Sequence, residues 1–312
     1  MWRRALKREP GWLAVAMSAA EMRFAFGRHA PEGKSVVTRC GVRTLGEGAQ
    51  SAERLAKELH FERRQCLTVL EPGQYQLLLV DAPAVPQAEL RSAIRWRIKD
   101  MLDYHVDDAT IDVLDIPPEG ATAAARGHSM YAVAARNEAI KGVIKSFEDA
   151  RIPLSVIDIP ETAQRNVAAL FETEGQGLAL LHFEQEYGLL TVNYRAELYL
   201  ARRIELGLGQ IASAAPGEAR EALFNRVVLE LQRTFDHFER QYRTISVTRL
   251  LLGPEPQETG LLEHVRANLG VTVERVDLDR ALALGAADLP PAERGRLFHL
   301  IGASLRHESK AL

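Results

Sequence analysis

Two glycine-rich segments are the first candidates for phosphate chemistry. Residues 27–35 (Gly-Arg-His-Ala-Pro-Glu-Gly-Lys-Ser) approach a Walker phosphate loop, but five residues separate the glycines instead of four. The valines that follow predict a strand where a phosphate loop needs the start of a helix. Residues 207–212 (Gly-Leu-Gly-Gln-Ile-Ala) fit a loose dinucleotide fingerprint, which requires a parallel strand with an acidic end about 20 residues further on. The sequence there stays helical to Arg243, so we interpret both segments as turns.

Hydrolytic and metal chemistry receive little support. The nine histidines are scattered, with no His-x-x-x-His pair and no cysteine at ligand spacing, so we expect no metal site. No Gly-x-Ser-x-Gly nucleophile elbow is present. Asp236 and His237 are neighbours, but successive residues of a helix point about 100° apart, which favours a solvated helix surface. The first strand carries no carboxylate, which excludes a two-metal nuclease.

An arginine-rich segment is the remaining candidate for binding. Four basic residues lie within a helical stretch around Trp96: Arg91, Arg95, Arg97 and Lys99. One interpretation is the solvated face of an amphipathic helix. The other is the rim of a peptide site, because arginine and tryptophan are enriched at interface hot spots. A net charge of −3 gives no general attraction to phosphate backbones, so we expect no nucleic-acid partner.

Composition limits the class of protein. The 312 residues are 46% hydrophobic and 26% charged, which is the ordinary globular mix and excludes disordered, collagen-like and disulfide-scaffold proteins. The two cysteines, Cys40 and Cys66, fit a reducing compartment. No run approaches the ~20 apolar residues that span a bilayer. The basic start and the short apolar segment Trp12–Met17 resemble an export signal only superficially, because such signals carry ~7–15 uninterrupted apolar residues.

The elements that must position these residues form a repeated order. In the first half we predict strands at 12–17, 22–26, 35–43, 66–70, 75–80, 110–116, 129–135 and 154–159, and helices at 49–61, 86–102, 137–150 and 161–172. In the second half we predict strands at 178–183, 188–193, 197–206, 247–252 and 271–276, helices at 218–243 and 260–269, and two C-terminal helices. When a helix–strand–strand–helix unit at about residues 83–152 is set apart as an insertion, each half follows the order three strands, helix, strand, helix.

This order predicts an α/β fold of duplicated βββαβα halves, actin-like (ribonuclease H-like), with an inserted αββα subdomain in the first half. Residues 11–82 and 153–173 would form the first actin-like subdomain, on which a C-terminal helix at 290–307 packs back. Residues 83–152 would form the insert. Residues 174–289 would form a reduced second domain.

Four motifs carry a resemblance to a known family. They are Val85–Trp96 (Val-Pro-Gln-Ala-Glu-Leu-Arg-Ser-Ala-Ile-Arg-Trp), Tyr131–Arg136, Leu229–Gln241 and Leu300–Arg306. In this order and spacing the chain resembles the PilM-type actin-like assembly proteins of type IV pili. Within that family it most resembles MshI, the version that serves mannose-sensitive haemagglutinin (MSHA) pili. The likeness extends from about residue 11 to residue 306.

The resemblance implies a nucleotide site between the halves, but the sequence departs from it in three loops. Active relatives need an aspartate at the end of the first strand of each half, where this chain has Ser18 and Glu184. The adenosine-side glycine pair reads Gly253-Pro254. Gly207 and Gly209 complete the degenerate nucleotide-binding set, and only residues 207–217 stand where relatives carry a lid subdomain. We therefore expect no catalytic residues and no cofactor, with binding of ATP and Mg²⁺ as the alternative.

The resemblance also implies a partner. In the family, the cleft between the first-half core and the insert holds the short cytoplasmic tail of a bitopic inner-membrane protein, which is PilN-like or MshJ-like. We expect the contacts from the insert helix, through Leu90, Arg91, Ile94, Arg95 and Ile98. The protein would be cytoplasmic, would reach the inner membrane through this partner, and would contact other pilus platform components; a homodimer stays open. A type II secretion L-like scaffold is the related alternative, but that protein continues into a transmembrane helix, whereas this chain ends at Leu312.

Overall fold

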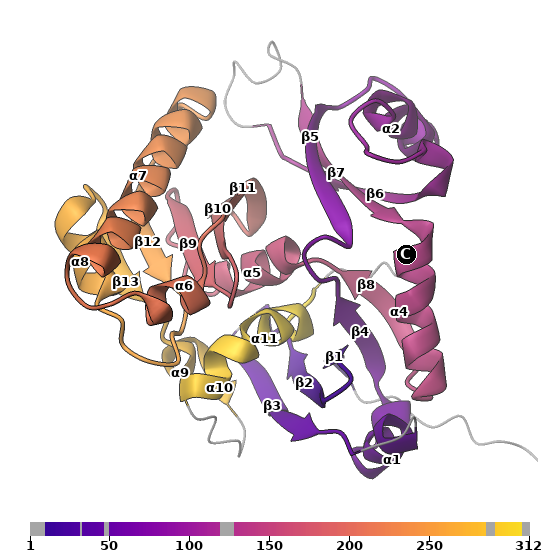
Figure 1. The fold of residues 1–312 in the computed structure, drawn as a ribbon. Coiled ribbons are helices and arrows are strands. Elements are labelled where there is room, and N and C mark those ends of the chain that lie inside the picture. Colours follow the sequence, from indigo (N-terminus) through magenta and orange to yellow (C-terminus); the bar gives the residue numbers. More distant parts are fainter. Residues whose placement is uncertain (1–9, 32, 47–49, 119–127, 285–290, 308–312) are drawn as a thin grey trace, which may run out of the picture.

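The computed structural model describes residues 10–31, 33–46, 50–118, 128–284 and 291–307 (Figure 1). Three β-sheets and the helices between them make up this part of the chain. None of its helices combines the length and the apolar character that crossing a membrane requires.

A six-stranded sheet of order β14-β3-β2-β1-β4-β8 holds most of the first half. Its strands are β1 Trp12–Met17, β2 Glu21–Arg28, β3 Ser35–Thr44, β4 Gln65–Val69, β8 Leu154–Asp158 and β14 Leu282–Leu284. The first three form an antiparallel meander, whereas β4, β8 and β14 run parallel to their neighbours. Helix α1 (Gln50–Glu58) and the 3₁₀ turn Phe61–Arg63 connect β3 to β4. Strand β8 ends the sheet, so one of its edges has no partner strand among the described residues.

A five-stranded sheet of order β11-β10-β9-β12-β13 forms the second half. Its strands are β9 Gly177–Phe183, β10 Gly188–Tyr194, β11 Glu197–Ile204, β12 Val247–Leu252 and β13 Thr272–Arg275. Every residue of β9 is buried, because the strand has a helical layer on both sides. Leu181 packs in a cluster with residues of α7 (Glu218–Gln241) and α8 (Leu261–Asn268), whereas Leu180 faces α5 (Pro160–Ala168) and α11 (Phe298–Ser304).

A three-stranded antiparallel sheet of order β5-β7-β6 forms the insert. Its strands are β5 Tyr75–Asp81, β6 Ala109–Asp115 and β7 Ser129–Arg136, and its helices are α2 Leu90–Ile98 and α4 Asn137–Asp149, with 3₁₀ turns at Gln87–Glu89 and Val106–Asp108. Strand β5 was predicted from the sequence but placed before the boundary at residue 83. Its pairing with β7 starts this unit at Tyr75, so that the unit begins with a strand and not with a helix.

Helices α5 and α11 lie between the two large sheets and hold them together (Figure 1). Every residue of α5 is buried, and α11 packs on α5 and on strands β1, β2 and β4. Gly302 permits the close approach of the two helices, because a β-carbon there would overlap the carbonyl oxygen of Ala163. The C-terminal segment therefore packs on the first-half sheet although it follows the second half in sequence.

Two short elements of the second half were not predicted. Helix α6 (Leu208–Ser213) occupies part of the predicted loop between β11 and α7. Strand β14 pairs in parallel with β3 and extends the first-half sheet. Helices α9 (Leu278–Ala281) and α10 (Pro291–Arg296) flank it in sequence.

Candidate functional site

A large cavity lies between two sheets whose end strands are neighbours. We call it the edge groove; it has a volume of about 1110 Å³, and β8, β6 and helix α4 line it. All residues of β8 contribute, although successive residues of a strand point to opposite faces. The groove therefore runs along the unpartnered edge of β8 and not over one face of the strand. Strand β6 is likewise an end strand of its sheet in the described part of the chain.

The edge groove has apolar walls and a charged rim. Its aliphatic lining comes from three directions: Val113 and Leu114 on β6, Ile140 and Ile144 on α4, and Ile157 on β8. Ile144 is 40% exposed, which is high for a large aliphatic side chain. This combination of open strand edge and apolar wall suits an extended peptide better than a small polar metabolite.

Two ion pairs lie on the rim of the edge groove. Arg91 reaches Asp112 at 3.0 Å, with 63% of the arginine side chain exposed. Arg306 reaches Asp158 at 2.8 Å, and both of these side chains are largely buried. Asp158 also accepts hydrogen bonds from the Ile159 backbone N–H and the Thr162 hydroxyl, which fixes this end of the groove.

The five residues predicted to contact a partner divide into two groups. Leu90 and Arg91 line the edge groove, Arg91 with an exposed side chain. Ile94 and Ile98 are fully buried under the three-stranded sheet, so their positions contradict a direct contact with a partner. Arg95 donates to the carbonyl oxygens of Val106 and Ala109 and so ties α2 to the start of β6. The apolar stripe of this helix is its core-facing side, which the sequence pattern alone did not distinguish from a binding face.

A second, smaller cavity lies where the turns of the two large sheets meet. We call it the central cleft; its volume is about 330 Å³. It is lined from the first half by Ala16, Arg23 and Glu71, and from the second by Glu184 and Tyr187, with Arg296 and His299 closing it from the C-terminal segment. Glu184 is the one residue of the predicted nucleotide-binding set that lines it.

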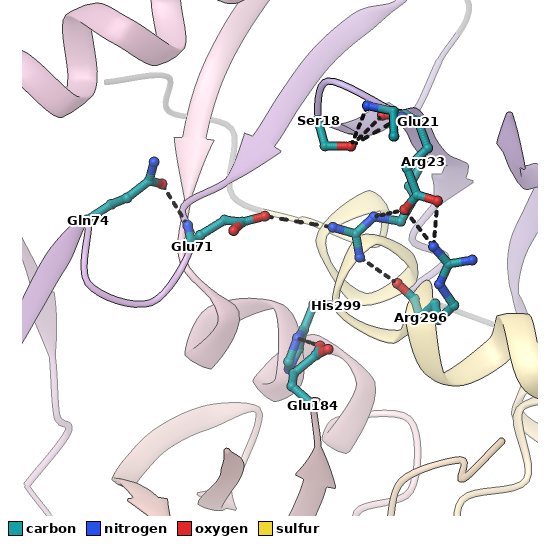
Figure 2. A network of polar contacts seen from close by, with 9 residues as sticks. Ser18, Glu21, Arg23, Glu71, Gln74, Glu184, Arg296 and His299 are labelled. Atoms are coloured by element: carbon teal, nitrogen blue, oxygen red, sulfur yellow. Dashed lines mark hydrogen bonds and ion pairs between the residues drawn. The ribbon is translucent and has the colours of Figure 1, made fainter. Parts of the chain in front are cut away.

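Arginines and carboxylates of the chain itself pair with one another at the central cleft (Figure 2). Arg296 pairs with Glu21 at 2.5 Å, and Arg23 lies 3.4 Å from the same carboxylate. Arg23 also donates to the Arg296 carbonyl oxygen and lies 3.7 Å from Glu71. Ser18 is used locally, since its hydroxyl bonds to the backbone of Glu21 across the β1–β2 turn.

The glycines predicted to contact a nucleotide serve the packing of the chain. Gly207 donates its N–H to the Gln210 side chain, and the N–H of Gly209 donates to the Gln185 carbonyl oxygen. Gly253 donates to the Leu181 carbonyl oxygen, and a β-carbon there would overlap the ring of His182. These three N–H groups are therefore already used and do not form a phosphate cradle.

Glu184 is the exception, because its carboxylate faces two histidines. Its Oε1 lies 2.9 Å from Nδ1 of His299 and 3.7 Å from Nε2 of His182. Burial opposes ionisation, but the hydrogen bond and charge of His299 prevail and lower the pKa of Glu184 to about 2. Burial lowers the pKa of His182 to about 3, against the opposing effects of Glu184 and the Gly295 backbone. The sequence analysis missed both histidines as site residues, because one lies on β9 and the other on α11.

No protein-family model matches the chain, and no curated protein sequence does. Among solved structures it is similar to a chain of the PilM–PilN type IV pilus biogenesis complex, with 18% identity over 95% of this chain and 97% of that chain and a TM-score of 0.70. It is also similar to the cytoplasmic domain of EpsL, an inner-membrane component of the type II secretion system of Vibrio cholerae (10% identity, 94% of each chain, TM-score 0.48). A protein of unknown function with an actin-like ATPase fold from Bacteroides thetaiotaomicron matches at 7% identity, 87% of this chain, 92% of that chain and a TM-score of 0.49. The predicted actin-like fold class is confirmed, and the chain has the fold seen in the PilM–PilN complex.

Proposed function

We propose that this chain is a scaffold of a type IV pilus assembly platform that captures the cytoplasmic tail of an inner-membrane protein in the edge groove. The observation that carries the proposal is the position of the groove, along the unpartnered edge of β8 and between aliphatic walls of β6 and α4. An end strand offers a row of unpaired backbone groups, which an extended segment of another chain can complete.

The groove suits β-strand addition followed by side-chain recognition. The backbone of the tail would pair with β8, and alternate side chains would point toward Val113, Ile144 and Ile157. Backbone pairing supplies affinity with little sequence preference, whereas the apolar walls select aliphatic side chains. Arg91 at the rim would favour an acidic or carboxylate-bearing neighbour of the bound segment.

The partner class follows from the similarity in fold. The similar solved chain comes from a complex with PilN, so we propose a PilN-like or MshJ-like tail, and an MSHA-like pilus as the system. Such a partner would hold the protein at the cytoplasmic side of the inner membrane, beside other components of the platform. In this role the protein is a scaffold without enzymatic activity that does not use ATP as a cofactor.

The test is titration of fluorescent synthetic tails of candidate PilN-like and MshJ-like proteins, read by anisotropy. Ile144→Glu places a charge on the wall of the groove and should weaken tail binding at least thirtyfold, the effect of losing a hot spot of about 2 kcal/mol. Ile144 is already 40% exposed, so the folded state should tolerate the change. Leu229→Glu on α7 is the matched control, since Leu229 is 44% exposed and does not line the groove.

Two further variants separate the two cavities. Arg91→Glu reverses a charge on the rim of the groove and should weaken binding of an acidic tail. Ser18→Ala changes the β1–β2 turn, away from the edge groove, and should leave binding within twofold. Equal loss in the Ile144→Glu and Leu229→Glu variants, or loss on changing Ser18 alone, would place the tail elsewhere and refute the proposal.

Two alternative functions predict different ligands for the two cavities. An ATP-binding actin-like ATPase that drives pilus assembly would use the central cleft, where the polar groups described above already pair with one another. A type II secretion L-like scaffold would use the same groove with another tail. Including tails from a secretion platform in the titration distinguishes the second alternative from the pilus assignment.

A further inference from the structure

Three metal-ligating side chains from separate elements meet at the back of the central cleft. His182 lies near the end of β9, Glu184 follows that strand, and His299 lies on α11. One ligand atom from each lies within 4.8 Å of the other two. Figure 2 shows Glu184 and His299 facing each other where the β9–β10 turn meets α11.

A buried amide sets the orientation of His299. The amide nitrogen of Gln164 donates to the carbonyl oxygens of Leu180 and Leu189 and to the Thr191 hydroxyl. Its oxygen is therefore the group that faces Nε2 of His299, at 3.3 Å. An amide oxygen can only accept, so Nε2 carries the hydrogen. This arrangement turns Nδ1 toward Glu184, and holding the second ring nitrogen in this way is typical of histidines that bind metals.

The contact between His299 and Glu184 needs a hydrogen or a metal ion between the two atoms. Carboxylate oxygen and neutral imidazole nitrogen both present lone pairs, yet Glu184 Oε1 and His299 Nδ1 are 2.9 Å apart. Either Nδ1 carries a hydrogen that it donates to Glu184, or a metal ion lies between the two groups. Both arrangements satisfy the Glu184 carboxylate, but only a metal ion would also use His182.

His182 is the observation that favours the metal. Its side chain is 1% exposed, and neither ring nitrogen has a well-aligned hydrogen-bond partner in the described ranges, although the ring lies near the Gly295 backbone. Buried polar atoms without partners are rare in native proteins. Nε2 of this ring lies 3.7 Å from Glu184 Oε1, on the side of the cluster.

We propose that His182, Glu184 and His299 bind one divalent transition-metal ion of the Zn²⁺ class, with an open coordination position toward the central cleft. Two imidazoles and one carboxylate form a donor set used for zinc with a water as fourth ligand. Imidazole selects such ions over Mg²⁺ and Ca²⁺, which prefer oxygen ligands. Ligand atoms on a tetrahedral zinc ion lie roughly 3.4 Å apart, so small side-chain rotations are enough to close the site.

A bound ion would join the two halves of the molecule. Two of its ligands come from the five-stranded sheet and its turn, and the third comes from α11, which packs on the six-stranded sheet. The ion would stabilise the closed arrangement of the halves at the position where a nucleotide was expected. It would thus act as a structural link.

The experiment is titration of the metal-free full chain with Co²⁺, whose visible absorption reports coordination, followed by displacement with Zn²⁺. We expect one Co²⁺ per chain, displacement by one equivalent of Zn²⁺, and no displacement by millimolar Mg²⁺. Changing an outer partner of a metal site costs 10–100-fold in affinity, so loss of a direct ligand should cost at least about 100-fold. Glu184→Gln and His299→Gln should both show this loss while circular dichroism confirms folding.

Two exposed histidines beside carboxylates supply matched controls. His60 lies 3.6 Å from Glu62, and His105 lies 3.5 Å from Asp107. His60→Gln and His105→Gln should leave Co²⁺ binding unchanged. Binding that survives Glu184→Gln and His299→Gln, or a wild-type chain that binds no Co²⁺ at millimolar concentration, would overturn the proposal. Tail binding in the edge groove is a separate readout, so failure of the metal site leaves the proposed function standing.

Discussion

The edge groove and the central cleft are two hollows of one fold with opposite chemistry. In the central cleft, Arg23 and Arg296 pair with carboxylates of the same chain, and the N–H groups of the nearby glycines donate within the chain. In the edge groove, a whole strand edge and several aliphatic side chains line a cavity of about 1110 Å³, more than three times the 330 Å³ of the cleft. Polar groups that already have partners contribute little binding free energy to a ligand, whereas an unpaired strand edge and exposed apolar walls can contribute more.

This difference indicates how one architecture can change its binding site. The sheets place turns on both sides of the central cleft whatever the residues in them are. Whether those turns bind phosphate depends on free N–H groups and on carboxylates for a hard cation. Here His182 and Glu184 stand at the strand end where an aspartate was expected, and the metal site proposed there would suit a softer ion than Mg²⁺.

The largest expected difference between the two regions is in how a glycine substitution changes the free energy of unfolding. Gly302→Ala would drive a β-carbon into the Ala163 carbonyl oxygen behind the central cleft and should lower the free energy of unfolding by about 2–3 kcal/mol. Gly142→Ala, on α4 beside the edge groove, meets nothing within 4 Å and should raise it by about 0.5–1 kcal/mol. Urea unfolding of the two variants measures both changes in the free energy of unfolding. If Gly302→Ala left the free energy of unfolding unchanged, the back of the central cleft would not be tightly packed.

The charged pairs of the edge groove should also differ from each other. Arg306→Ala removes the cationic partner of Asp158, which is 6% exposed and keeps only neutral donors, so a loss of about 2 kcal/mol is expected. Arg91→Ala breaks the exposed pair with Asp112 and should cost less than about 0.5 kcal/mol. Urea unfolding, with a double-mutant cycle through Asp158→Asn, isolates the buried pair. Equal losses of stability for Arg306→Ala and Arg91→Ala would mean that the end of the groove is as exposed to solvent as its rim.

Local pattern was enough to predict most strands and helices. Strands β1 and β12 begin and end where the sequence predicted, because alternating or continuous apolar residues stand between clear turn formers. Strand β14 was missed, since three residues carry no pattern and its pairing with β3 depends on contacts far away in sequence. For the same reason the pattern found β5 but not the sheet to which it belongs.

The candidate sites were less predictable than the fold. The stripe of α2 was visible in the sequence, but a helical period does not say whether that face meets the core or a partner, and Ile94 and Ile98 meet the core. The cluster of Glu184 with His299 could not be read from ligand spacing, because it depends on α11 returning to the first-half sheet. Glu184 itself was predicted as a site residue only through the position it holds on the strand end.

The smallest expected effect concerns ATP. If the central cleft has lost its phosphate-binding groups, Mg²⁺-ATP up to millimolar concentration should leave the melting temperature of the protein unchanged. A ligand present at 100 times its Kd adds about 2.7 kcal/mol of stability, which is readily seen in a thermal melt. A tail peptide at the same multiple of its Kd is the positive control, because it should raise the melting temperature through the edge groove. A clear rise in melting temperature with Mg²⁺-ATP that Ser18→Ala or Glu184→Gln abolishes would show that the central cleft binds ATP. That result would favour the ATPase alternative. An unchanged melt with Mg²⁺-ATP beside a shifted one with the peptide would support tail binding without ATP binding.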